Sequence, residues 1–258
     1  MIKLRVVNNQ FMASKGRDDF GFYDPRYTEI EQTLSRSTYP MRSLEWCCSS
    51  IKNGLTPAKE EYSVETTDTD ALIIKVANLT NSGLDFSDEK LSFVPEEVYM
   101  RVSKRAKAKL SDVLVLCAAH QRKYIGKRVD IIDALPIGFE TRTVVVAELL
   151  ILRVKPERID PYYLLSCLRL PIIQELVNKY VRGQTGHLYP TDLKELEIPV
   201  PEELETQQAI ARIVYDTEAK AKGLRDEIRN LEDVAARTLS ENILNGLSHG
   251  APGLVTSG

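Results

Sequence analysis

The residues best suited to binding chemistry in this chain are the lysines and arginines of residues 101–128. That segment carries nine basic side chains and one acidic side chain, although the whole chain of 258 residues has a formal net charge of −3. Phosphate oxygens attract such charges, and their neutralisation releases the counterions around a nucleic acid. We therefore predict phosphate contacts from the following basic residues: Lys104, Arg105, Lys107, Lys109, Lys123, Lys127 and Arg128.

Three neighbouring side chains in the same segment are of the types that reach base edges. A glutamine can bond adenine through two hydrogen bonds, and an arginine can bond guanine in the same way. His120, Gln121 and Arg122 are therefore candidates for base contacts. Two plainer interpretations stay open, because a charge run can be a solvated surface and His120 can be a hydrogen-bonded loop residue.

Two shorter segments add further candidate contact residues. Lys52, Asn53 and Thr56 lie in a second candidate contact loop. Thr185 is a further candidate, but residues 183–186 (GQTG) are better explained as a turn, since glycine adopts positive φ without steric cost.

No residue spacing in the chain supports catalysis. The phosphate loop GxxxxGK[ST] and the zinc motif HExxH are both missing from the sequence. Residues 24–27 (DPRY) are superficially similar to the Asp-Pro-Pro-Tyr loop of amino-methyltransferases, but an arginine replaces the second proline, and a turn before a helix explains them. Asp133 and Glu148 could belong to a nuclease metal site of the type that sets an aspartate before a Glu-x-Lys strand, but Leu149 and Leu150 follow Glu148, so the lysine is missing. We expect no catalytic residue, no metal and no cofactor on this chain.

Bulk composition is that of an ordinary soluble protein, with 43% hydrophobic and 28% charged residues. No apolar run approaches the ~20 residues of a membrane span, and the first residues lack the apolar core of a signal peptide. The four cysteines (Cys47, Cys48, Cys117 and Cys167) lie in hydrophobic surroundings without CxxC spacing, so we expect reduced, buried thiols in a cytoplasmic protein.

The elements that must position the binding residues alternate between strands and helices. Strand-like runs occupy 71–76, 112–118, 128–132, 143–146 and 149–154, and helices are indicated at 26–34, 95–108, 160–167 and 172–181. We predict an α/β (α+β) domain with a mixed sheet and flanking helices. Because residues 112–118 separate the two basic runs, we expect both runs to flank one end of that strand and to form one patch.

A long helix is predicted from about residue 203 to about residue 245. Its apolar residues alternate in steps of four and three, and they are Ile210, Val214, Thr217, Ala221, Leu224, Ile228, Leu231 and Ala235. Such a narrow seam is typical of a coiled coil, although a helix packed on its own domain is the alternative. The expected organisation is a lead-in segment (1–39), a globular domain (40–202), a long pairing helix (203–247) and a flexible tail (248–258).

Three sequence blocks, in this order, resemble the specificity (S) subunit of type I restriction–modification enzymes. The first is residues 44–46 (LEW) with 51–57 (IKNGLTP); the second is 110–114 (LSDVL) with 125–127 (IGK); the third is Gly183-x-Thr185 with 193–201 and 207–210. Ser111 departs from the Gly-Asp pair that the family usually has. Residues 17–27 also resemble a lead-in of some members.

The resemblance implies a non-catalytic reader of double-stranded DNA, whose α/β target-recognition domain grips the major groove. Its implied partners are DNA adenine methyltransferase subunits, which carry AdoMet, and a restriction subunit, which uses ATP and Mg²⁺. Family members usually hold two recognition domains and two long helices, so this chain resembles a half-subunit. We therefore expect a homodimer through the long helix and a two-part, symmetric DNA site.

Two other interpretations belong to different classes of protein. One is a non-enzymatic protein-interaction adaptor, with a basic docking patch for an acidic protein surface and a coiled-coil stalk. The other is a small nuclease or methyltransferase.

Overall fold

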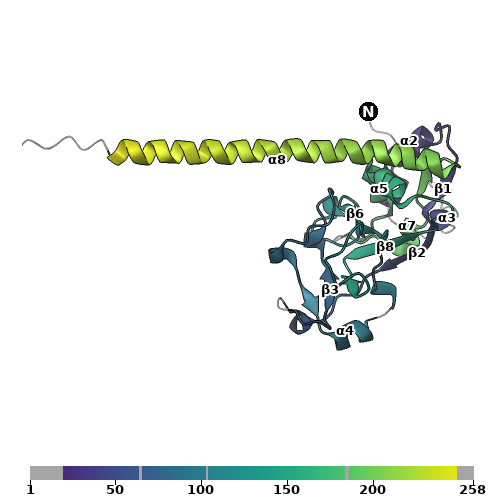
Figure 1. The fold of residues 1–258 in the computed structure, drawn as a ribbon. Helices are drawn as coiled ribbons and strands as arrows, with labels where there is room; N and C mark the ends of the chain where they lie inside the picture. Colours follow the sequence, from purple (N-terminus) through teal and green to yellow (C-terminus); the bar gives the residue numbers. More distant parts are fainter. Residues whose placement is uncertain (1–19, 64–65, 103, 184–185, 249–258) are drawn as a thin grey trace, which may run out of the picture. The chain divides into compact units, whose positions relative to one another are not determined.

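A computed structural model describes residues 20–63, 66–102, 104–183 and 186–248, and it confirms the predicted fold class (Figure 1). A mixed α/β domain is followed by one long helix, α8 (Leu204–Ser248). The chain divides into two compact units, one ending at Val214 and one beginning at Tyr215, so the border falls inside α8.

A four-stranded antiparallel sheet is the centre of the first unit. Its order is β2 (Cys48–Asn53), β8 (Leu149–Val154), β5 (Val113–Leu116) and β6 (Val129–Ile131). Successive side chains of a strand point to opposite faces, so Val113 and Val115 enter one hydrophobic core while Leu114 and Leu116 enter another. Both faces of the sheet are buried, which explains why the central strands read as uninterrupted apolar runs.

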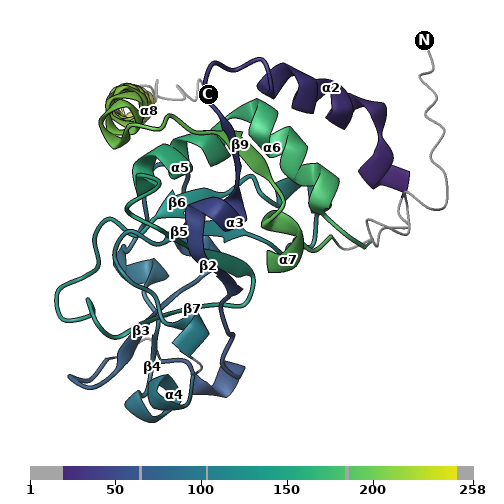
Figure 2. The same cartoon turned by 90° about the vertical axis from the view of Figure 1, so that its right-hand side faces the viewer.

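The first core lies between this sheet and a layer of helices. The helices are α2 (Pro25–Leu34), α3 (Leu44–Cys47), α5 (Pro161–Arg169), α6 (Pro171–Val177) and α7 (Pro190–Leu193), and a two-stranded sheet joins β1 (Met41–Ser43) to β9 (Glu197–Pro199). Figure 2 shows α2 beside α6. Tyr27 and Leu34 of α2 are buried in this core, so the segment that the sequence presents as a polar lead-in helps to build the domain.

The second core lies on the other face of the four-stranded sheet. It is closed by a three-stranded sheet of order β4 (Phe93–Val94), β3 (Ala71–Ile74) and β7 (Thr143–Val145), together with α4 (Glu96–Arg101). Strands β3 and β7 are parallel, whereas β3 and β4 are antiparallel. The sheet structure is therefore mixed, as predicted.

Two predicted helices are shorter than expected. The helix expected over 95–108 ends at Arg101, because Lys107 bridges to Val144 and the Ala108 amide donates to the Thr143 carbonyl (3.0 Å). Pairing with β7 thus takes the backbone away from the helix. The helix expected over 172–181 ends at Val177 and continues as a single 3₁₀ turn (Asn178–Tyr180).

The start of α8 is fixed to the domain by Gln207, whose side chain is completely buried. Its Oε1 accepts a hydrogen bond from the Asp160 amide (2.8 Å), and its Nε2 donates to the carbonyls of Pro201 (2.8 Å) and Arg158 (3.1 Å). A buried amide with every partner satisfied specifies its position strongly. The first turns of α8 therefore belong to the domain, and Ile210 and Ala211 pack against the first core.

The second unit contains the rest of α8, and several large apolar side chains of this part of the helix are exposed. Leu224, Ile228 and Leu231 expose 53%, 56% and 63% of their surface. The alternative of a helix packed on its own domain holds for the first turns of α8, where Ile210 and Ala211 pack against the first core.

Candidate nucleic-acid interface

Strand β5 separates the two basic runs. The first run, residues 101–109, precedes Val113, and the second, residues 122–128, follows Leu116. Val113 pairs with Ile131 of β6 and Val115 with Val129, so the second run lies at the Leu116 end of the strand. The prediction that both runs flank one strand end is wrong, because an extended strand carries the chain across the sheet and the runs leave it at opposite ends.

The Leu116 end of the sheet brings together several predicted residues on a surface that we call the loop face. It consists of residues 53–56, 117–128, 147–148 and 187. Antiparallel pairing explains the assembly, because Asn53 of β2 lies opposite Leu150 of β8, which in turn lies opposite Val115 of β5. Three segments that are distant in sequence thus end at the same edge.

Hydrogen bonds join these segments directly. The Asn53 side-chain amide donates to the Ala147 carbonyl (3.3 Å), and the Thr56 hydroxyl donates to Glu148 Oε2 (2.9 Å). On the other side, Ala118 forms a β-bridge with His187. The second candidate loop therefore lies beside the loop that carries the second basic run.

The loop face exposes charged and polar side chains around a pocket of about 740 Å³. His120, Gln121, Lys123 and Arg128 are exposed, and Lys127 is half-buried. The pocket lining comprises Val76, Leu116, Ala118, Ala119, His120, Gln121, Tyr124, Arg128, Glu148 and His187. Sequence reasoning missed Tyr124 and His187, and it considered Glu148 only as a metal ligand. The available signals were an aromatic residue inside a basic run and a histidine just after the glycine turn.

Arg122 has a structural function in this loop. Its guanidinium donates to the carbonyl of Val181 (3.0 Å) and, at 3.4 Å, to those of Asn178 and Gly183. These bonds tie the short 3₁₀ turn Arg122–Tyr124 to the chain beyond α6. The guanidinium of Arg122, which was predicted to bond a base, thus bonds main-chain carbonyls instead. His120 and Gln121 remain as the base-edge candidates of this loop.

The first basic run lies at the opposite end of β5. Lys104 and Lys109 are exposed, and the Lys107 ammonium lies 3.9 Å from the centre of the Tyr99 ring. Asp112, the acidic residue of the segment, is buried and accepts two hydrogen bonds from Arg153, at 2.8 and 2.7 Å. These bonds raise the pKa of the Arg153 guanidinium.

The structure gives no account of two of the predicted DNA contacts. The side chain of Arg105 and the whole of Thr185 lie outside the described residues. Lys52, at the end of β2, is exposed.

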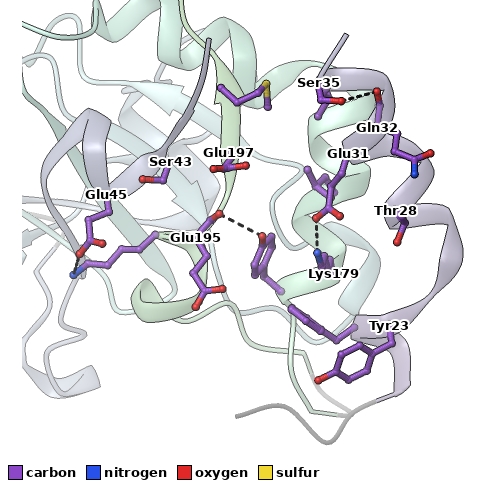
Figure 3. Close-up of a pocket in the computed structure, with 16 residues that line it drawn as sticks. Tyr23, Thr28, Glu31, Gln32, Ser35, Ser43, Glu45, Lys179, Glu195 and Glu197 are labelled. Carbon is purple, nitrogen blue, oxygen red and sulfur yellow. Dashed lines mark hydrogen bonds and ion pairs between the residues drawn. The ribbon is translucent and has the colours of Figure 1, made fainter. Parts of the chain in front are cut away.

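A second cavity of about 760 Å³ lies between α2 and the β1–β9 sheet (Figure 3). Four glutamates line it, of which Glu31 pairs with Lys179 and Glu45 with Lys194. Glu195 and Glu197 add two further carboxylates. This excess of acid disfavours phosphate, so the cavity is a poor candidate for a nucleic-acid contact.

The described residues contain no group of three or more histidine, cysteine or acidic side chains that could hold a metal ion. All four cysteines are buried and unpaired, as predicted, and burial raises the pKa of Cys47, Cys48 and Cys117 to about 12. Such thiols are almost entirely protonated near neutral pH and are weak nucleophiles. None of the described helices is long and apolar enough to cross a membrane.

The fold defines a class of protein. It is an α/β domain that carries a polar loop face, and its chain continues into a helix of 45 residues. The type I restriction modification DNA specificity domain matches residues 49–232, and the chain belongs to this family. The resemblance noted in the sequence is therefore confirmed.

Individual relatives agree with this assignment. A protein described as a type I restriction enzyme MjaX specificity subunit, from Methanocaldococcus jannaschii, is 28% identical over 181 residues, which are 69% of this chain and 39% of that protein. The S subunit of a type I restriction–modification system from M. genitalium superposes with a TM-score of 0.51 at 20% identity, over 83% of this chain and 49% of that one.

A further solved structure, from work on complex assembly and conformational transition of the type I system, gives a TM-score of 0.54 at 16% identity, over 92% of this chain and 56% of that one. At these identities the solved structures share the fold. The chain spans about half the length of the solved chains and less of the curated relative.

Proposed function

We propose that this chain is a sequence-specific DNA-binding specificity subunit of a type I restriction–modification complex, with no catalytic residue of its own. The observation that carries the proposal is the loop face, where the basic and base-edge candidates of residues 120–128 lie beside residues 53–56 and 147–148 at one end of the central sheet. Sites built at the ends of packed strands hold side chains more precisely than free loops do.

The residues of the loop face have two proposed functions, contact with phosphates and contact with base edges. Lys123, Lys127 and Arg128 neutralise phosphates, which gives affinity and places the domain on the duplex. His120 and Gln121 reach base edges in the major groove, where each base pair presents a distinct pattern of donors and acceptors. Arg122 holds the loop in shape through its three carbonyl contacts.

Family membership supports partners that perform the chemistry. We propose that DNA adenine methyltransferase subunits bind this chain and carry AdoMet, which supplies the methyl group. A restriction subunit would carry ATP and Mg²⁺. Because the substrate is cellular DNA, the complex would act in the cytoplasm.

The exposed stripe on α8 supports pairing with a second copy of the chain. Leu224, Ile228, Leu231 and Ala235 continue the heptad, and the next exposed apolar residues, Leu239 and Ile243, follow at steps of four. Such a stutter locally unwinds a coiled coil. Two copies would present two loop faces to a DNA site of two parts.

Pairing through α8 is tested by sedimentation equilibrium of the full chain at micromolar concentration. We expect the mass of a dimer for the wild type and the mass of one chain for Ile228→Glu with Leu231→Glu, since two buried charges oppose association. The control is Tyr215→Glu, which changes an exposed aromatic residue outside the apolar seam, and this variant should stay dimeric. A wild-type mass of one chain would reject pairing of identical copies.

The function as a whole is tested by methylome sequencing of a host with and without this chain. We expect adenine methylation at one recurring two-part sequence, and its loss when the chain is deleted, because only the specificity subunit selects the site. A methylome that does not change on deletion would contradict the proposal.

A further inference from the structure

Glu148 places a carboxylate in the otherwise basic loop face. It lines the 740 Å³ pocket together with His120, Gln121, Tyr124, Arg128 and His187. A negative charge beside the lysines and arginines of residues 122–128 repels phosphate and weakens general attraction to DNA. A carboxylate on a DNA-contacting surface is useful where it accepts a hydrogen bond from a base, because it can then select for amino groups.

The position of Glu148 is fixed from the main chain. Its carbonyl accepts hydrogen bonds from the amides of Cys117 (2.8 Å) and Ala118 (3.3 Å), which follow β5 directly. The residue is therefore attached to the end of the central sheet, and it shares that end with the loop that carries His120 and Gln121.

The carboxylate itself is oriented by a short chain of hydrogen bonds. The Ala147 amide donates to the Thr56 hydroxyl oxygen (2.9 Å), and that hydroxyl donates to Glu148 Oε2 (2.9 Å). Within the part of the chain that the structure describes, the other oxygen, Oε1, has no hydrogen-bond or ion-pair partner. One oxygen is thus held in place, while the second is available to a ligand.

We propose that Glu148 is a specificity-determining residue, which accepts through Oε1 a hydrogen bond from the exocyclic amino group of a base in the major groove. The amino group is N4 of cytosine or N6 of adenine. Guanine and thymine present carbonyl oxygens there, which a carboxylate repels. The same contact therefore favours adenine or cytosine and rejects guanine and thymine. Thr56 is the positioning residue. This inference rests on the proposed function, because it requires that the loop face meets duplex DNA.

The test is selection of bound duplexes from a randomised library by the full chain, followed by sequencing. For the wild type we expect one position of each half-site to be restricted to adenine or to cytosine, and the selected base identifies the amino group. For Glu148→Gln we expect the preference at that position alone to fall by about tenfold to a hundredfold, because the amide can both donate and accept. Thr56→Val keeps the shape without the hydroxyl and should weaken the same preference less.

Further measurements separate base reading from a structural effect. Glu148→Gln should keep its thermal midpoint and should bind unselected duplex at least as tightly as the wild type, since one negative charge is removed. A merely structural role would instead lower stability and weaken all sequences alike. Unchanged preferences at every position in Glu148→Gln would overturn the inference and leave the proposed function intact. A wild-type chain that selects no sequence would overturn both.

Discussion

Replacing Lys123, Lys127 and Arg128 together by alanine is expected to weaken binding to duplex DNA by about a hundredfold at 0.1 M salt. Each phosphate contact contributes about 0.9 to the slope of log affinity against log salt concentration, so the slope should flatten by about 2.7. The loss should be nearly uniform across sequences, because phosphate contacts do not distinguish bases. Fluorescence anisotropy with a labelled duplex at several salt concentrations measures both quantities.

The matched control removes the same amount of charge from the other end of β5. Lys104, Lys107 and Lys109 lie at that opposite end. Their triple replacement should leave most of the affinity and the slope in place, apart from the weak long-range attraction that salt screens. If this second triple caused the larger loss, the DNA would lie at the other end of the strand, and the loop face would be the wrong surface.

Gly54→Ala is expected to destabilise the domain by more than about 3 kcal/mol, an effect that belongs to the severe end of single substitutions. A Cβ atom at this position would lie 2.1 Å from the carbonyl oxygens of both Val145 and Val146. Main-chain atoms of a packed strand cannot move aside as a flexible side chain can. The Gly54 amide also bonds the Leu149 carbonyl (3.0 Å), so the strand end cannot retreat without losing that bond.

Urea denaturation, followed by the fluorescence of Trp46, measures the effect of Gly54→Ala. Gly21→Ala is the matched control, because nothing lies within 4 Å of a Cβ atom there, and we expect a change within about 0.5 kcal/mol. Equal midpoints for the two variants would show that the approach of β2 to residues 145–146 is looser than the structure indicates.

Periodicity in the sequence predicted much of the fold, for physical reasons that are visible in the structure. The strands β5 and β8 were predictable because both of their faces are buried, which leaves an apolar run that no loop would carry. The helix α8 was predictable because its heptad is regular from Ile210 to Ala235. Helix ends were harder to predict, since α4 stops where residues 107–108 begin to pair with β7, and no local propensity encodes that pairing.

The candidate site was only partly predictable from sequence. Basic charge indicated the second run, but proximity along the chain suggested one patch where β5 in fact makes two. The contact of residues 53–56 with residues 147–148 depends on strand pairing across about 90 residues, which a single sequence does not reveal. Glu148 was therefore visible as an acid but not as a member of the loop face.

The loop face is held mainly by main-chain hydrogen bonds, and this has a consequence for how recognition can change. The Gly126 amide donates to the Leu116 carbonyl (2.8 Å), and the Leu188 amide donates to the Cys117 carbonyl (2.9 Å). These bonds do not involve the exposed side chains of His120, Gln121 and Lys123, so those positions can be exchanged at little cost to folding. A lineage could therefore acquire a new target sequence through a few substitutions at the tip of an unaltered scaffold.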